Sequence, residues 1–144
     1  MLKKIMFIVS LVITNCTSET EIMKHPLDKS EVRTLVLENG IQVYLLSDPK
    51  FNVSAASMSV EVGSLQDPDK REGLAHFLEH MLFLGTEKYP DVDEYSTYLK
   101  TYGGYSNAYT AGDHTNYQFQ VLPDGYEGAL DRFAQFFISP LFTD

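Results

Sequence analysis

The sequence predicts an α+β fold in which helices cover one face of a largely antiparallel sheet. Three observations support this prediction. In stretches of residues 32–62, apolar residues alternate with small or polar ones, as in strands. From Leu74 they recur every three or four residues, as in a helix, and residues 105–122 again contain short runs typical of strands. With 144 residues, 44% hydrophobic and 22% charged, the chain has enough apolar material for one ordinary soluble domain.

Three strands are expected first. Residues 32–37 and 41–46 are rich in strand-forming residues, and Asn39-Gly40 between them is a strong hairpin signal because both residues tolerate positive φ. Residues 54–62 then alternate in pattern, with small side chains that favour close packing of one strand face.

The pattern becomes helical at Leu74–Leu82, where spacings of three and four predict a helix whose apolar face turns to the core and which stops at Gly85. A second helix is expected at 91–102, opened by the capping-box pair Asp91 and Glu94. Two strands and a last helix complete the order βββααββα, at 105–110, 117–122 and 126–137.

Residues 1–16 have the layout of a secretory signal. Lys3 and Lys4 precede a nine-residue apolar run, 5–13, after which the chain turns polar. The run is shorter than the roughly 20 apolar residues that a membrane span needs. We therefore expect this segment to direct export, although a buried N-terminal strand is the alternative. A polar linker is expected at 17–30.

Cys16 is the only cysteine, so no intramolecular disulfide can form. It follows the apolar run as the acylated cysteine of bacterial lipoproteins does, but Asn15 stands where a small residue is usual. Two forms of an exported, bacterial periplasmic protein therefore stay open, one soluble and one lipid-anchored. The formal net charge of −9 argues against nucleic acid and anionic membranes as partners, which leaves the anchor at Cys16 as the only expected membrane contact.

The segment GLAHFLEHMLFLG, residues 73–85, carries two of the four histidines. His76 and His80 are four residues apart, so on a helix they lie on one face and can share one cation. Two imidazoles with an open coordination position favour Zn²⁺. Glu79 need not bind the metal and can instead accept a proton from metal-bound water.

The alternative is a solvated polar face with hydrogen-bonded histidines. Beside Phe77 and Met81, however, two buried histidines and a carboxylate would cost several kcal/mol without a metal or partners. A purely structural metal site would need further ligands nearby, and we identify none in the sequence. The spacing His-x-x-Glu-His is the motif of the inverzincin metallopeptidases.

The residues around this motif resemble the pitrilysin/insulinase family, over a stretch from about Val32 to Phe142. The matching segments are Asn39–Gly40, Ser47–Pro49, Gly73–Thr86, Glu94–Tyr95, Gly103–Gly104, Ser106–Ala108, His114–Tyr117 and Glu127–Phe137. The resemblance implies a zinc-dependent endopeptidase and a first domain of a clamshell that encloses peptides.

The resemblance also implies zinc on His76 and His80, with Glu79 as the general base. The third ligand in the family is a glutamate roughly 70 to 80 residues past the second histidine, whereas only 64 residues follow His80. We therefore expect residues 31–144 to be the N-terminal part of a zinc peptidase domain, with its third ligand beyond the chain end. Two imidazoles hold zinc weakly, so this chain alone is expected to be inactive.

Peptide substrate is implied to add as a strand along Ser106, Asn107, Ala108 and Tyr109, because an exposed strand edge pairs with any extended backbone. Phe83 matches a position that lines a specificity pocket in the family, with core packing as the alternative. Asn107 could equally be a turn residue.

The expected partners are a peptide substrate and the remaining domains of the full-length protein. The competing hypothesis is a non-catalytic peptide-binding or structural homologue of the same fold. Such homologues have typically lost part of the zinc motif, which is intact here.

Overall fold

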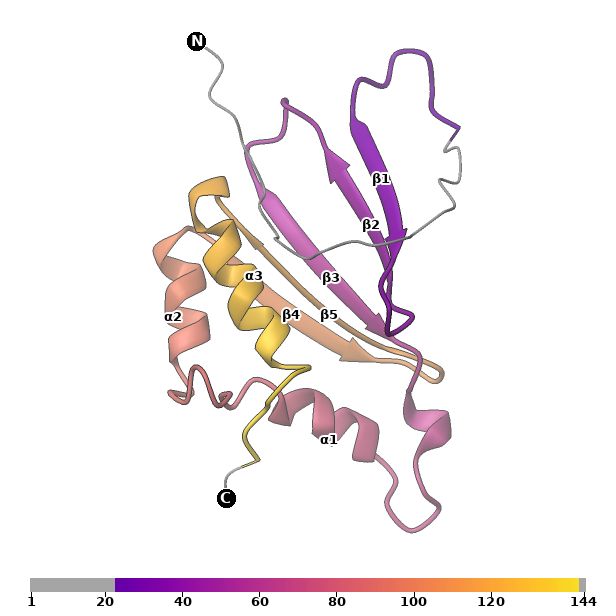
Figure 1. Cartoon of the computed structure of the whole chain (residues 1–144). Helices are drawn as coiled ribbons and strands as arrows, with labels where there is room; N and C mark the ends of the chain where they lie inside the picture. The colour runs from indigo at the N-terminus through magenta and orange to yellow at the C-terminus, as the bar shows by residue number, and fades with distance from the viewer. Residues whose placement is uncertain (1–22, 143–144) are drawn as a thin grey trace. The chain divides into compact units, whose positions relative to one another are not determined.

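The computed structural model of the chain describes residues 23–142 (Figure 1). They form two compact units, one up to Lys50 and one from Phe51 onward. The expected signal segment 1–16 lies outside the described residues, as does the first part of the 17–30 linker, so export stays a prediction. Within the described range, no helix combines the length and apolarity needed to cross a bilayer.

The N-terminal unit contains the predicted hairpin. Strands β1 (Glu31–Val36) and β2 (Gln42–Ser47) pair antiparallel, and Val36 opposite Gln42 is their last pair. Gly40 has a φ of 87° in the connection. The strands thus begin and end within one residue of the prediction, and the connection is longer than a two-residue turn.

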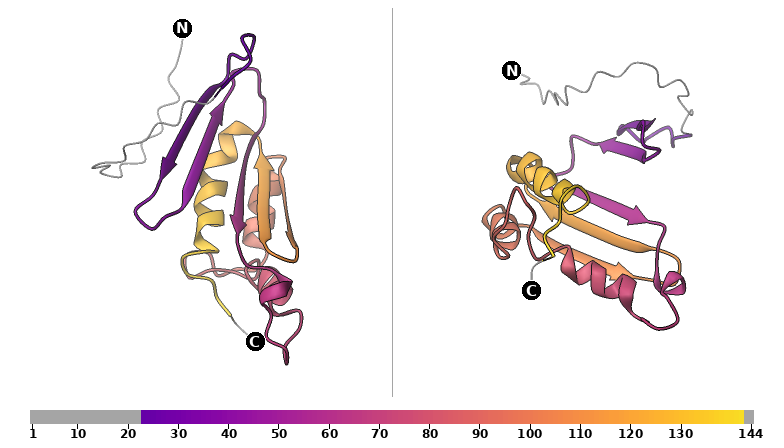
Figure 2. Two further views of the ribbon diagram at one scale, coloured as in Figure 1. Left: turned by 90° about the vertical axis from the view of Figure 1, so that its right-hand side faces the viewer. Right: turned by 60° about the horizontal axis from the view of Figure 1, so that its bottom comes forward.

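The second unit is built on a three-stranded antiparallel sheet. Its strands are β3 (Ser54–Val60), β4 (Tyr105–Thr110) and β5 (Thr115–Val121), in the spatial order β3-β5-β4. Strand β4 is therefore an edge strand: among the described residues it pairs on one side only. Figure 2 shows the helices beside this sheet, and their bounds are Leu74–Met81 for α1, Glu94–Thr101 for α2 and Tyr126–Gln135 for α3.

The hydrophobic core lies between β5 and the helices. Tyr117, Phe119 and Val121 are at most 3% exposed and alternate with more exposed residues, so they share one face of β5. This face packs against Leu99 of α2 and Phe133 of α3. The rings of Phe119 and Phe133 meet edge to face, with centroids 5.2 Å apart. The predicted α+β class and element order are confirmed.

Helix α1 forms where it was predicted, and Leu82 at its end is buried as expected, but the prediction of a buried face was wrong for the other leucines and Phe77. Leu74, Phe77 and Leu78 are 42%, 62% and 44% exposed, and none of the described residues covers them fully. Glu79 is the one buried residue of the helix. The helix turns its Glu79 side toward the sheet, and the apolar side chains that next join the core are those of Leu82 and Phe83, just after the helix.

The start of α2 also differs from the expected capping box. The Asp91 carboxylate accepts a hydrogen bond from the Asp93 amide at 2.9 Å, and the helix begins only at Glu94. Glu94 instead forms a two-pronged ion pair with Arg132 of α3, at 2.6 and 2.8 Å. The Arg132 guanidinium lies 3.8 Å from the centroid of the Tyr98 ring. This partly buried pair joins α2 to α3.

Candidate metal centre

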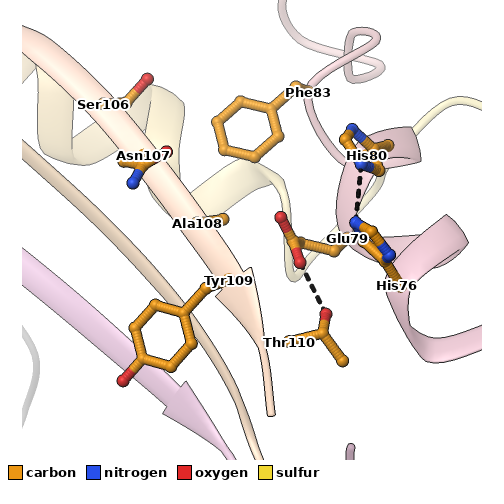
Figure 3. A pocket seen from close by; sticks show the side chains of 9 residues that line it. All are labelled: His76, Glu79, His80, Phe83, Ser106, Asn107, Ala108, Tyr109 and Thr110. Carbon is orange, nitrogen blue, oxygen red and sulfur yellow. Dashed lines mark hydrogen bonds between the residues drawn. The ribbon is translucent and has the colours of Figure 1, made fainter. Parts of the chain in front are cut away.

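One cavity of about 510 Å³ lies between α1 and the edge strand β4 (Figure 3). It brings together every residue that the sequence assigned to the zinc motif and to substrate binding, although their roles stay predictions. The lining residues are His76, Glu79, His80 and Phe83 from α1 and the turn after it, and Ser106, Asn107, Ala108, Tyr109 and Thr110 from β4. Only Thr110 was not anticipated.

The two histidines face each other across one helical turn. Their Nε2 atoms are 2.9 Å apart and both residues are exposed. Two nitrogens that bind one tetrahedral zinc at about 2.0–2.1 Å are about 3.3 Å from each other, so a small rotation of either ring would suit the ion. Ligand atoms of His76, Glu79 and His80 lie within 4.8 Å of one another, and in residues 23–142 no further His, Cys, Asp or Glu joins them. The donor set fits zinc.

Glu79 occupies the sheet side of the cavity. It is 6% exposed, and its Oε2 accepts a 2.6 Å hydrogen bond from the Thr110 hydroxyl. Burial, and then the negative charge of Glu79, raises the pKa of the Tyr117 phenol to about 12. The carboxylate is thus held between the histidines and the strand layer, where a proton acceptor is needed if substrate lies along β4.

Strand β4 divides its side chains between two faces. Ser106, Ala108 and Thr110 are half-buried and alternate with the exposed Asn107 and Tyr109. Figure 3 shows Ala108 and Thr110 directed toward α1 and Tyr109 directed away from it. A strand added to this edge would lie along all four predicted residues and pair with the backbone groups of alternate ones, because the others face β5. Of the four, only Ser106 and Ala108 share the side-chain face of the zinc motif.

Phe83 takes part in both alternatives that the sequence left open. Its ring lines the cavity and also packs edge to face on Phe136, with centroids 5.1 Å apart. The core contact is therefore present, and the role in substrate specificity stays a prediction.

Gly104 sets the position of β4. A Cβ at this residue would lie 2.2 Å from the Gln120 carbonyl oxygen and 2.5 Å from Cγ1 of Val121. Only glycine lets the chain leave α2 and begin pairing with β5 at this distance. The start of β4 is thereby held tightly against β5, the strand that keeps it in the sheet.

Asp67 anchors the first turn of α1, the helix that forms the other wall of the cavity. Its Oδ2 accepts a hydrogen bond from the Gly73 amide at 2.7 Å, and its Oδ1 accepts one from the Ala75 amide at 2.8 Å. These amides have no acceptor within the helix, so the carboxylate satisfies them and complements the helix dipole. The contact was not predicted because Asp67 lies in the loop, six positions before Gly73 in the chain.

Replacing Asp67 with alanine is expected to lower the free energy of unfolding of the chain by about 1 kcal/mol and to weaken zinc binding through a less ordered α1. Urea denaturation of the chain measures the first effect and a zinc competition titration the second. Asp69→Ala is the matched control, since it removes the same charge from the same loop. Equal stability of the two variants would contradict the anchoring role.

A helix with an inverted zinc motif, packed against the open edge of an antiparallel sheet, defines the class as an inverzincin-type metallopeptidase domain. The family model "Insulinase (Peptidase family M16)" matches residues 42–144, and the chain belongs to this family. The family resemblance expected from the sequence is confirmed.

Several relatives share most of this chain. Insulin-degrading enzyme from Homo sapiens is 57% identical over 123 residues, which cover 85% of this chain and 12% of that protein. The "Putative zinc protease mug138" of Schizosaccharomyces pombe is 52% identical over 118 residues, 82% of this chain and 12% of that protein. A crystal structure of pitrilysin superposes with a TM-score of 0.81 at 42% identity and covers 85% of this chain.

The chain spans 12% of the length of these curated relatives and 13% of the pitrilysin chain. A further relative, from Arabidopsis thaliana, is 58% identical over 123 residues and is named "Insulin-degrading enzyme-like 1, peroxisomal". Membership of the family therefore does not by itself imply export, and the prediction for this chain rests on residues 1–16.

Proposed function

We propose that this chain is part of a zinc-dependent endopeptidase that hydrolyses peptides bound along the edge of β4. The observation that carries the proposal is the cavity in which two imidazole nitrogens, 2.9 Å apart, adjoin a buried carboxylate and an open strand edge. The names of the relatives support the same class of reaction.

His76 and His80 would hold the metal through their Nε2 atoms. A third ligand would come from outside the described residues, because no other potential ligand adjoins the cluster within them. Zinc bound at such a site polarises a carbonyl group and lowers the pKa of a bound water to about 7.

Glu79 would act as the base. As water adds to the carbonyl carbon of the scissile peptide bond, the carboxylate accepts its proton. The carbon–nitrogen bond then breaks, and Glu79 passes the proton to the departing amine nitrogen. Its burial beside the strand places this acceptor on the side of the cavity from which a peptide paired with β4 would present its carbonyl groups.

Recognition of the substrate would rest mainly on backbone pairing. The outward edge of β4 carries no described partner strand, so its free N–H and C=O groups can pair with an extended peptide of almost any sequence. Phe83 and the inward-facing Ser106 and Ala108 would add side-chain contacts. The other expected partners are the remaining domains of the full-length protein.

The full-length protein is expected to cleave a fluorogenic peptide, to lose this activity after zinc is removed with 1,10-phenanthroline and to regain it when zinc is restored. The 144-residue chain alone is expected to be inactive because its histidine pair holds zinc weakly. Cleavage that persists in the zinc-free protein would contradict the proposal. Peptide binding without cleavage by the zinc-loaded protein would favour the alternative, a non-catalytic homologue.

A further inference from the structure

The hydrogen bond between Thr110 and Glu79 joins the end of the edge strand to the proposed base. We propose that Thr110 is a positioning residue: its hydroxyl holds Oε2 of Glu79, so that Oε1 is the oxygen that takes the proton from water and returns it to the amine. This inference rests on the proposed function and adds to it the residue that orients the base.

The direction of the bond follows from chemistry. An ionised carboxylate can only accept hydrogen bonds, so the Thr110 hydroxyl must donate. At 2.6 Å the contact has the length of a charge-assisted bond, which is stronger than one between neutral groups. Because Glu79 is 6% exposed, little water competes for this oxygen.

The hydroxyl itself is placed by rigid parts of the sheet. Thr110 is the last residue of β4 and pairs with Thr115 of β5, whose own hydroxyl donates to the Val62 carbonyl at 2.8 Å. The next residue, Ala111, receives a hydrogen bond at its carbonyl from the Ser64 amide at 2.9 Å. A β-branched side chain on such a backbone has few χ1 rotamers, so the hydroxyl has little freedom to leave Glu79.

A fixed carboxylate matters because the last torsion of a glutamate is broad and roughly two-fold. The two oxygens are equivalent, so a two-fold flip changes nothing, but without a partner the plane of the carboxylate could rotate within this broad range. Part of the population would then direct neither oxygen at the reacting groups. Figure 3 shows the second oxygen of Glu79 directed away from Thr110, into the space between β4 and the histidine-bearing helix. Holding one oxygen therefore presents the other to substrate in advance of the reaction.

The orienting role predicts a specific kinetic pattern in the full-length protein. Thr110→Val keeps the shape and removes the donor, and is expected to lower kcat by about 10- to 100-fold, part of the 10²–10⁴ that a general base contributes. KM and zinc affinity are expected to stay within about twofold, because neither ligand nor strand edge is altered. Thr110→Ser restores the donor and is expected to recover most of kcat.

Thr101→Val is the matched control. The Thr101 hydroxyl also donates a hydrogen bond, to the Thr97 carbonyl on the exposed side of α2, and Thr101 does not line the cavity. Removal of this hydroxyl is expected to leave kcat unchanged. A wild-type kcat in Thr110→Val would overturn the inference, as would equal losses in the Val and Ser variants or a change confined to KM.

A structural readout tests the same point without activity. In crystals of the full-length Thr110→Val variant, the Glu79 carboxylate is expected to take more than one orientation while the β4 backbone is unchanged. A single orientation like that of the wild type would overturn the inference. Failure of the proposed function gives a different result, because the wild-type protein itself would then cleave no peptide.

Discussion

Glu79→Gln is expected to abolish turnover in the full-length protein while zinc stays bound. The amide has the size of the carboxylate, and its oxygen can still accept the Thr110 hydroxyl, so the cavity keeps its shape. The amide cannot take a proton from water, however, and the loss in kcat should be at least about 100-fold. Elemental analysis of zinc and peptide cleavage by the same preparation measure the two properties together.

The control is Glu87→Gln, which neutralises an exposed carboxylate just beyond α1 that lines neither the cavity nor the zinc motif. It should retain both zinc and turnover. Hydrolysis at the wild-type rate by the Glu79 variant would remove this residue from the role of base. Loss of zinc from that variant would make Glu79 a ligand instead.

The second large effect is expected from the histidines. His76→Ala and His80→Ala each remove one of two adjacent ligands, so zinc affinity should fall by more than the roughly 10- to 100-fold typical of a lost outer partner. Activity should fall with it. Competition with a chromophoric chelator measures the affinity, and peptide cleavage at saturating zinc shows whether excess metal restores turnover.

His114→Ala provides the comparison for both variants. His114 lies just beyond β4, where its ring contacts Asp113 and Tyr109 rather than the zinc motif. It should bind zinc as the wild type does. The assignment of the ligands would be contradicted if His114→Ala lost as much affinity as the other two, or if either of those kept it.

The strands were predictable because their signals are local. Residues 105–110 were placed correctly, since Gly103-Gly104 ends the preceding helix and Ala111-Gly112 ends the strand. The errors arose where a residue far away in the sequence determines which contact a side chain makes. Glu94 was expected to cap its own helix, but Arg132 of α3 binds it, and the side of α1 that faces the sheet is the one with Glu79 rather than the more apolar one.

The site, like the fold, was predictable where its signals are local in the sequence. Helical spacing alone puts His76, Glu79 and His80 together, and the family resemblance points to the strand that forms the opposite wall. Thr110 was not predicted because it lies 31 positions after Glu79 in the chain and no pattern in the adjacent sequence marks it. The alternation of side chains along β4 puts Thr110 on the same face as Ser106 and Ala108. Only the fold shows that this face contacts Glu79 of α1.

The most direct test is the position of the metal itself. Anomalous diffraction at the zinc edge, from crystals of the zinc-loaded full-length protein, should give a peak about 2.0–2.1 Å from Nε2 of both His76 and His80, with Glu79 close by but outside coordination distance. A peak elsewhere, or one coordinated by Glu79 in place of a histidine, would contradict the division of roles between two ligands and a base.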